Sequence, residues 1–281
     1  MKKILVFMLI AVIGLSCVFA GCGQQLNFGK ELIPYKSQLD ALTQLNQGTV
    51  DVAIIDSVMA GYYTSTGDFA QNLQMINGLV FAEEQYGIAA KKGNDALISK
   101  INEGLIALAD TDYKAVAQTY GLTESLLITS ATANPNASAT DNSWNEIVAD
   151  KKLIIGYTVF APIAYTEADV FKGFDIDLAK AVVAYLNETY SAEIVIEFQV
   201  IDWNSKETLL ENGSIDLVWN GMTITPERSA EMCISVPYLA NKQVAVIAKA
   251  DANKFTNKDS LKDAIIAVES GSAGEGVVVK K

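Results

Sequence analysis

Short apolar runs alternate with amphipathic stretches along most of this chain. In residues 37–48, SQLDALTQLNQG, apolar side chains recur at helical spacing and the stretch ends on glycine, while residues 49–57, TVDVAIIDS, contain a buried-strand pattern. Residues 205–213, SKETLLENG, and residues 214–225, SIDLVWNGMTIT, repeat this order. The alternation predicts an α/β fold, with helices packed on mostly parallel sheets.

The two helix and strand units share the spacing L-x-x-G-x-[VI]-D. The matching positions are Leu45, Gly48 and Asp51 in the first unit and Leu210, Gly213 and Asp216 in the second. One such match is weak, because any helix, turn and strand can produce it, but its repetition indicates two similar lobes. The alignment places Asp56 and Gly221 at the carboxyl ends of equivalent strands, where open α/β sheets bind ligands.

The first 22 residues have the layout of a secretory signal peptide. Two lysines precede an apolar run over residues 4–19, which is too short for a membrane span, and small residues follow. The segment ends FAGC and resembles the bacterial lipobox, with Phe where Leu is usual. The resemblance implies that Cys22 is lipidated and attaches the mature protein to the membrane; plain cleavage and an uncleaved anchor are the alternatives.

Composition excludes several classes of function. Half of the 281 residues are hydrophobic, so a large core can be buried, and the formal net charge of −12 argues against nucleic-acid binding. Histidine is absent, which excludes a Ser-His-Asp triad and imidazole metal ligands. No phosphate-binding loop is present either, and we expect no cofactor and no metal. Cys17 and Cys22 belong to the leader, so Cys233 is expected to be a lone buried thiol.

Two tracts resemble bacterial extracytoplasmic solute-binding proteins of the polar amino-acid type. The stretch from Leu153 onward, with LIIGYTVFAPIAY, FKGFDIDLAKAV, IDLVWNGMTITPERSAEMCISVPYLANKQVAVIAK and LKDAIIAVESGSAGE, is similar to the first half of that family. Residues 31–122, which begin ELIPYKSQLDALTQLNQGTVDVAIIDSVMAGYY, are similar to its second half. The resemblance implies a two-lobed periplasmic-binding-protein-like clamshell, each lobe a mostly parallel sheet flanked by helices.

The two halves stand in reversed order, which indicates a circular permutation. In the family's order the loop at residues 270–276 continues at Leu26, while residues 126–142, LLITSATANPNASATDN, read as a linker that joins the old termini. A truncated tandem gene is the alternative. The expected organisation is a lipoprotein signal peptide at 1–22, the second part of the smaller lobe at 26–82, a return to the larger lobe at 83–125, the linker at 126–142, the larger lobe at 143–245, and the first part of the smaller lobe at 246–281.

The stretch WNGMTITPER carries the most specific site signal. A planar guanidinium binds a carboxylate in a bidentate way, and Arg228 arrives near a helix start marked by Thr-Pro-Glu. The resemblance implies that Arg228 and Thr223 hold a ligand carboxylate, and that Asn220 and Gly221 offer backbone groups to its ammonium. The alternative is an exposed Arg228 that caps the helix and pairs with Glu231.

The remaining site residues come from other segments. Asp56 ends a buried strand and, by resemblance, meets the ammonium, although a helix N-cap is the plain alternative. The resemblance assigns Ser272 and Ala273 to carboxylate binding, and Phe160 and Trp203 to the walls around the ligand side chain. Core packing is the alternative for both aromatic residues. Trp219 is expected in the core, and Glu269 either favours a cationic ligand or faces solvent.

The implied function is that of a receptor, not an enzyme. An amino acid is captured between the lobes and delivered to an ABC transporter permease by a monomeric lipoprotein on the outer face of the cell membrane. Residues 238–249 and 83–92 are expected to cross between the lobes and to let them close. A sensor module and a cyclic-acid dehydratase on the same fold are the alternatives, as is a nonfunctional product.

Overall fold

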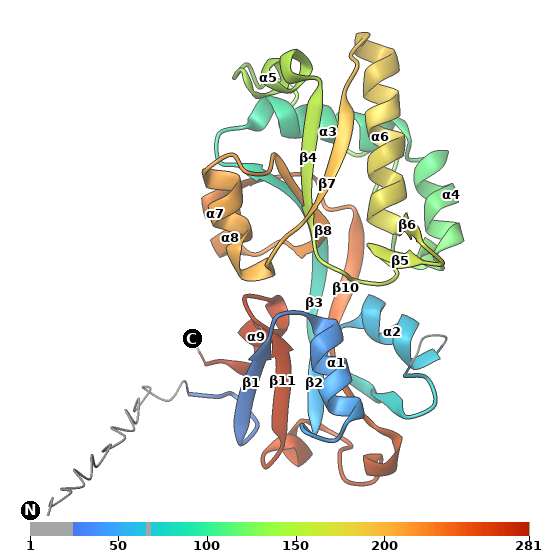
Figure 1. Ribbon diagram of the computed structural model, residues 1–281, viewed down its shortest axis with the longest axis vertical. Helices are drawn as coiled ribbons and strands as arrows, with labels where there is room; N and C mark the ends of the chain where they lie inside the picture. Colours follow the sequence, from blue (N-terminus) through green and yellow to red (C-terminus); the bar gives the residue numbers. More distant parts are fainter. Residues whose placement is uncertain (1–24, 66–68, 281) are drawn as a thin grey trace, which may run out of the picture.

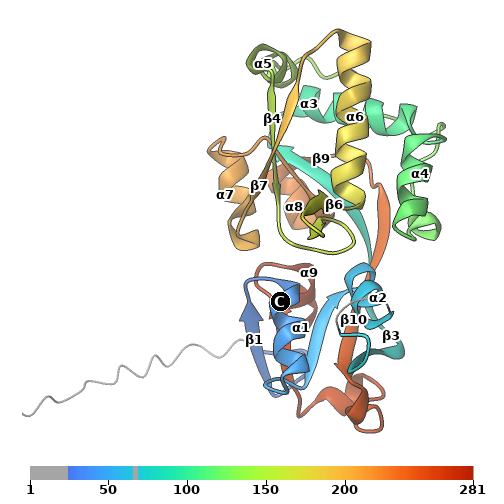
Figure 2. The same cartoon turned by 45° about the vertical axis from the view of Figure 1, so that its right-hand side comes forward.

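The molecule consists of two α/β lobes stacked along its long axis (Figure 1). The computed structural model describes residues 25–65 and 69–280, so the lipidation site expected at Cys22 lies outside the described residues. Figure 2 shows the same two lobes from another side, joined through β3 and β10. Among the described residues, no helix combines the length and the apolar character that a membrane span needs.

The smaller lobe is assembled from both ends of the described chain. Its sheet has the order β1-β11-β2, all parallel, and β10 then pairs antiparallel with β2. Its elements are β1 (Glu31–Tyr35), α1 (Gln38–Asn46), β2 (Val52–Asp56), α2 (Ser57–Ser65), β11 (Ile265–Glu269) and α9 (Ala273–Val278). Every residue of β2 is buried, as its apolar run predicts.

The larger lobe is built around the parallel strands β8, β4 and β7. Helices cover its faces, and a small hairpin precedes the longest of them. Its elements are α3 (Asp95–Ala107), α4 (Asp112–Thr119), α5 (Ser143–Asp150), β4 (Lys152–Tyr157), β5 (Tyr165–Glu167), β6 (Val170–Lys172), α6 (Phe174–Tyr190), β7 (Val195–Val200), α7 (Lys206–Glu211), β8 (Leu217–Thr223), α8 (Pro226–Glu231) and β9 (Met232–Ile234). Short 3-10 turns lie at Thr123–Ser125, Trp203–Ser205, Lys249–Asp251 and Lys258–Leu261.

Two long strands run through both lobes, β3 (Leu73–Lys91) and β10 (Leu239–Ala248). They pair with each other in antiparallel register, while β10 also pairs with β2 and β3 also pairs with β8. The strands of the two lobes therefore form one continuous nine-stranded sheet. The crossing segments expected at 238–249 and 83–92 coincide with β10 and the second half of β3 to within one residue at each shared end.

The two aspartates of the repeated spacing, Asp51 and Asp216, make equivalent hydrogen bonds in the two lobes. The backbone N–H of Asp51 donates to the carbonyl of Ile265 over 2.9 Å, and its carboxylate accepts from the Ile265 N–H at 2.8 Å. Asp216 makes the equivalent pair with Ile154, at 2.9 and 2.7 Å. Each aspartate thus closes the start of its strand onto the parallel neighbour, which gives a physical reason for the repeated spacing.

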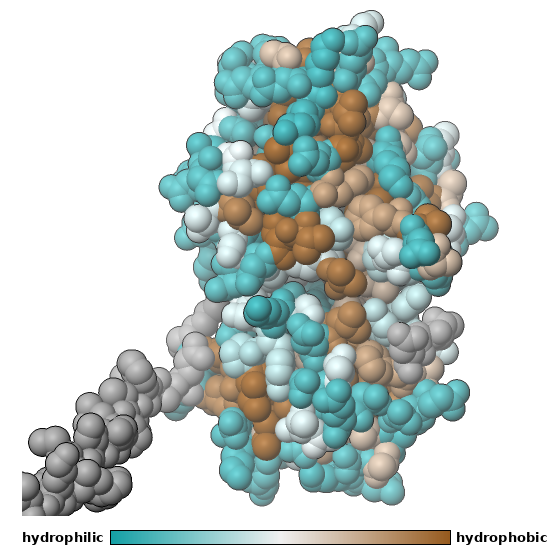
Figure 3. All heavy atoms as spheres, viewed as in Figure 1, coloured by the Kyte–Doolittle hydropathy of each residue, from teal (hydrophilic) through white to brown (hydrophobic). Residues whose placement is uncertain are grey.

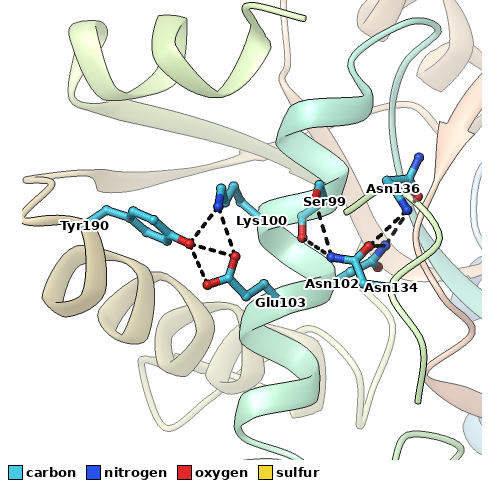
Figure 4. A network of polar contacts seen from close by, with 7 residues as sticks. All are labelled: Ser99, Lys100, Asn102, Glu103, Asn134, Asn136 and Tyr190. Atoms are coloured by element: carbon cyan, nitrogen blue, oxygen red, sulfur yellow. Dashed lines mark hydrogen bonds and ion pairs between the residues drawn. The ribbon is translucent and has the colours of Figure 1, made fainter. Parts of the chain in front are cut away.

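The segment at residues 126–142 is docked on α3 (Figure 4). The side chain of Asn134 donates to the Ser99 carbonyl over 2.9 Å, and that of Asn136 donates to Asp95 over 2.8 Å. In the same view, Lys100 and Glu103 on the neighbouring face of α3 meet the hydroxyl of Tyr190 from α6. The segment contains no helix or regular strand, but it is held in place.

Apolar side chains gather on one face of the larger lobe, around β4 and β7 (Figure 3). Val195 and Val200 of β7 are among the exposed large hydrophobic residues, and β7 is the last strand of the sheet on that side. Cys233 is a buried free thiol in β9, as expected from the sequence, and it donates to Asp95 over 3.3 Å. Trp219 is fully buried, which confirms its expected place in the core.

Candidate functional site

A cavity lies between the two lobes. Its walls hold all nine residues that the sequence analysis assigned to a ligand site, together with five others. The lining residues are Gln38, Asp56, Met59, Thr158, Val159, Phe160, Trp203, Asn220, Gly221, Thr223, Arg228, Glu269, Ser272 and Ala273. The structure thus brings together residues that lie more than 200 positions apart in the sequence.

Arg228 reaches the cavity from the first turn of α8. The helix begins as its sequence predicts, since Thr225 is the N-cap and its hydroxyl accepts from the Arg228 N–H over 3.2 Å. Twenty lysines and a single arginine make up the basic residues of the chain. The one guanidinium therefore lies at the position where a bidentate donor suits a carboxylate.

The Arg228 side chain is only 9% exposed and is held by backbone carbonyls. Nη1 donates to the Thr223 carbonyl over 2.7 Å, and Nη2 donates to the Gly271 carbonyl over 3.0 Å, across the cleft. Burial lowers the pKa of this guanidinium. Within the described ranges no carboxylate lies at ion-pair distance from it, so the alternative of an exposed cap paired with Glu231 is wrong.

Asp56 enters the cavity at the end of β2 in the opposite lobe. The carboxylate is 5% exposed and is surrounded by donors: Oδ1 accepts from the Tyr86 hydroxyl at 2.7 Å and from the amides of Asn241 and Gln243, and Oδ2 accepts from the amide of Gln38. Burial raises its pKa to about 7, the charge of a neighbouring glutamate adds to this, and the donors oppose it.

Gly221 lines the cavity where β8 departs from regular pairing. The ladder between β3 and β8 is irregular between the pairs at Gly87 and Ala89, and Gly221 adopts a φ of +61°. A Cβ there would lie 2.7 Å from the ring of Phe160. The Gly221 N–H donates to the buried carboxyl of Asp175 over 2.7 Å, and this hydrogen bond holds the Gly221 peptide in place.

Asp175 was missed by the sequence analysis. It is fully buried at the start of α6, Oδ2 also accepts from the Tyr238 hydroxyl over 2.8 Å, and burial raises its pKa to about 7. The side chain of Asn220, next to Gly221, pairs with Thr158 at 2.8 Å. These contacts fix the backbone that faces the cavity.

Both expected aromatic residues lie in the cavity wall. Phe160 and Trp203 are buried, and the guanidinium carbon of Arg228 lies 6.0 Å from the centre of the Trp203 ring. Lys206, which the sequence did not single out, is 2% exposed behind the same ring. Its ammonium pairs with Glu207 at 2.9 Å, and burial lowers its pKa, with the nearby guanidinium adding to the effect.

The loop before α9 closes the cavity from the smaller lobe. Ser272 caps this helix, since its hydroxyl accepts from the Glu275 N–H over 3.1 Å, and Glu275 in turn accepts from the Gly271 N–H over 2.7 Å. A Cβ on Gly274 would lie 2.9 Å from the Ile54 carbonyl oxygen. Glycine there allows the loop to pack closely against β2.

Glu269 points into the cavity rather than to solvent. Its side chain is buried at the end of β11, and its pKa is raised to about 8, first by burial and then by the nearby Asp56. The solvent-facing alternative is therefore wrong. Two carboxyl groups and one guanidinium thus converge on the same cavity, beside two aromatic rings.

Comparison with known proteins identifies relatives for half of the chain. Residues 153–270 match the model of bacterial extracellular solute-binding proteins, family 3. Curated relatives include the arginine-binding extracellular protein ArtP of Bacillus subtilis, 38% identical over 141 residues, which cover 50% of this chain and 51% of ArtP. A glutamine-binding protein of Geobacillus stearothermophilus is 30% identical over 48% of this chain and 51% of that protein. The chain spans about half the length of these relatives.

Solved structures match over shorter segments. A substrate-binding protein of an ABC uptake transporter from Streptococcus pneumoniae with bound histidine is 36% identical, over 32% of this chain and 35% of that one, with a TM-score of 0.28. A polar amino acid ABC uptake transporter substrate-binding protein from Streptococcus thermophilus is 41% identical, over 35% and 36% of the two chains, also with a TM-score of 0.28.

Proposed function

Because residues 153–270 match the model of bacterial extracellular solute-binding proteins, family 3, we propose that this chain captures a free amino acid between its two lobes. One observation carries the proposal: Arg228 and Asp56 line the same cavity from opposite lobes. A zwitterion brings a carboxylate and an ammonium a few ångströms apart, and burying either charge without a partner is costly. A guanidinium and a carboxylate on facing walls supply both partners.

Arg228 and Asp56 can each form further hydrogen bonds with a ligand. Arg228 has five N–H donors, and protein carbonyls account for two of them. Asp56 Oδ2 accepts from Gln38 and retains a lone pair, while Oδ1 is saturated. In the proposed complex Arg228 and the Ser272 loop grip the ligand carboxylate, Asp56 and the Gly221 carbonyl meet its ammonium, and the aromatic walls enclose its side chain.

Thr223 takes a more modest part. Its carbonyl accepts from Arg228, and its hydroxyl donates to Glu84 over 3.0 Å. In the proposed site the Thr223 carbonyl therefore orients the guanidinium of Arg228. The Thr223 hydroxyl can bind the ligand only if it gives up its hydrogen bond to Glu84. Movement of β3 and β10 would open and close the cavity.

The two curated relatives named above are an arginine-binding and a glutamine-binding protein, and we propose binding rather than catalysis for this chain. Delivery to an ABC transporter permease, monomeric state and lipid attachment through Cys22 are part of the same proposal. Since a site with charge partners already in position loses little on binding, a dissociation constant of roughly 1 μM or below is expected, about −8 kcal/mol.

A thermal unfolding screen against the common amino acids tests the function. Ligand that binds only the folded state raises Tm, so one or a few amino acids are expected to do so. Arg228→Ala and Asp56→Ala are expected to abolish the shift, whereas Lys114→Ala, on the exposed face of α4, is expected to keep it. A shift that survives in either site variant removes that residue from the site, and no shift with any amino acid contradicts the function.

We also propose that the chain is a circular permutant of the family's fold. In support, residues 25–27 lie beside the end of α9: Lys280 N–H donates to the Gln25 carbonyl over 2.7 Å, and Leu26 bridges Val279. A chain reordered as residues 143–281 followed by 25–125 is expected to fold and bind like the original. A dimer by light scattering, with halves exchanged between copies, would instead favour the truncated tandem.

A further inference from the structure

A chain of polar side chains, in which Glu84 is half-buried, connects the two walls of the cavity through both crossing strands. It runs from Asp56 in the smaller lobe to Asn241 and Gln243 on β10, then to Glu84 on β3, and ends at Thr223 in the larger lobe. The three contacts to Glu84 all reach its Oε2, each at 3.0 Å. None of these three linking residues was singled out from the sequence.

The two amides on β10 each bridge the same pair of acids. Nδ2 of Asn241 donates both to Asp56 Oδ1 and to Glu84 Oε2, and Nε2 of Gln243 does the same, over 3.1 and 3.0 Å. The orientation of Asn241 is fixed independently, because its Oδ1 accepts from the Val58 backbone N–H over 3.4 Å, and it also accepts from the Ser57 hydroxyl over 3.1 Å. The amide nitrogens therefore face the acids, which act as acceptors.

Gln243 also touches the loop that closes the cavity. It is fully buried, and its Oε1 has no hydrogen-bond partner within the described part of the chain. That oxygen lies 2.9 Å from where a Cβ on Gly274 would stand. The polar chain thus contacts β2, both crossing strands, the carboxyl end of β8 and the start of α9.

Asp56 and Glu84 thus share the same two amide donors. Within residues 25–65 and 69–280, neither acid has a lysine or arginine at ion-pair distance. The titratable groups that face Asp56 are Tyr86 and Glu84 on β3, Glu269 on β11, and the guanidinium of Arg228 on α8, which is held by carbonyls. The second negative charge makes a buried carboxylate at Asp56 costly until a cation arrives.

We propose that Glu84 is a positioning residue of the pocket, which holds Asp56 and Thr223 in place across the crossing strands and makes the capture of an ammonium group displace a proton from Asp56. The inference rests on the proposed function. No covalent bond changes: the ammonium stays protonated, the carboxylic acid of Asp56 becomes a carboxylate, and its proton passes to the buffer.

Isothermal titration calorimetry with L-arginine and L-glutamine, each in phosphate and in Tris, counts the protons released. Since burial raises the pKa of Asp56 to about 7, roughly half a proton is expected to leave Asp56 per L-glutamine bound at pH 7. L-arginine is expected to release more, because its side chain also draws Glu269, whose pKa is raised to about 8, into the charged form. Affinity for L-glutamine is expected to rise with pH, by up to about tenfold per unit below pH 7 and little above it. Glu84→Gln keeps the shape of the side chain and is expected to lower the proton count and flatten this profile.

Glu83→Gln is the matched control. It removes one charge from the adjacent position of β3, where the side chain is exposed and lies 3.5 Å from Lys242. It is expected to leave the proton count at the wild-type value. An equal proton count in Glu84→Gln and the wild type would overturn the inference, as would an equal loss in both variants.

A measurement without ligand separates this inference from the proposed function. If neither amino acid binds, the proposed function is contradicted. Thermal unfolding between pH 4 and pH 8 still measures the interaction between Asp56 and Glu84. The raised pKa of Asp56 means that the folded state holds a proton that the unfolded chain releases, so Tm falls as pH rises from about 4 to about 7. Glu84→Gln is expected to make that fall shallower, and an unchanged slope would overturn the inference.

Discussion

The carbonyl oxygen of Gly271 in the smaller lobe accepts a 3.0 Å hydrogen bond from Nη2 of Arg228 in the larger lobe. The same guanidinium donates to the Thr223 carbonyl at the end of β8. The Arg228 side chain therefore contacts both the end of β8 in its own lobe and the loop before α9 in the opposite lobe. A ligand carboxylate placed between the lobes would share these donors.

Arg228→Lys is expected to weaken amino-acid binding by roughly 10- to 100-fold without unfolding the protein. Lysine keeps the charge but loses the planar pair of donors, and a hydrogen bond to a charged group contributes about 1.5–3 kcal/mol. Calorimetric titration measures the loss, and circular dichroism checks the fold. Wild-type affinity in this variant would show that charge alone suffices and that the geometry of the guanidinium is not used.

Glu269→Gln is expected to lower the affinity for L-arginine relative to L-glutamine, by about tenfold at pH 8. The raised pKa of Glu269, about 8, keeps it mostly neutral at lower pH, so a cationic side chain has to draw it into the charged form. The ratio of the two dissociation constants is the readout. If the ratio stays constant, Glu269 does not set the preference for a charged side chain.

Asp175→Asn is expected to stabilise the protein above pH 7. The pKa of Asp175 is raised from 3.8 to about 7 in the folded state, which therefore retains a proton that the unfolded chain has lost. The wild type should lose roughly 2–4 kcal/mol of unfolding free energy from this group between pH 4 and pH 7. Asparagine mimics the protonated form, since its oxygen still accepts from Gly221 and Tyr238.

Urea unfolding at several pH values measures this effect. Asp177→Asn, a partly exposed neighbour on α6, is the control for removing one acid from the helix. A wild-type loss between pH 4 and pH 7 that persists unchanged in Asp175→Asn would assign it to other groups.

Asp51→Ala and Asp216→Ala are expected to cost similar amounts, about 1–3 kcal/mol each, because each leaves a backbone N–H of the neighbouring strand without its acceptor. The effects should add in the double variant, since the two sites lie in different lobes. The Asn variants keep an acceptor oxygen and should be milder. A large loss at one site and none at the other would contradict the equivalence of the two units.

The resemblance to a known family, carried by motifs such as WNGMTITPER, implied nine of the fourteen residues that line the cavity. The local pattern alone left Arg228 and Asp56 open as helix caps, and it was the resemblance that implied a ligand contact for each. That these two residues and the loop at Ser272 line one cavity is a finding of the structure, whereas their contacts with a ligand stay predictions.

The supporting shell could not be read from the sequence. Asn241 and Gln243 lie in an ordinary strand pattern, and their partners come from β2 and β3, so no local spacing marks them. Lys206 follows an aromatic turn, as many surface lysines do, and only tertiary packing buries it. Buried carboxyls such as Asp175 look like first-turn helix acids, for which solvent exposure is the usual outcome.

The place of β11 in the smaller lobe has a consequence for how the protein is made. This strand lies between β1 and β2 and pairs with both in parallel, for example through Ile265 with Glu31 and Ile266 with Val52. During synthesis the ribosome releases the two outer strands first and the central one only after the whole larger lobe. The sheet of the smaller lobe therefore stays incomplete until the end of synthesis, and the last step of its folding is the insertion of β11 between β1 and β2. Such a non-local pairing is slow, and until it occurs the unpaired edges of β1 and β2 are open to aggregation.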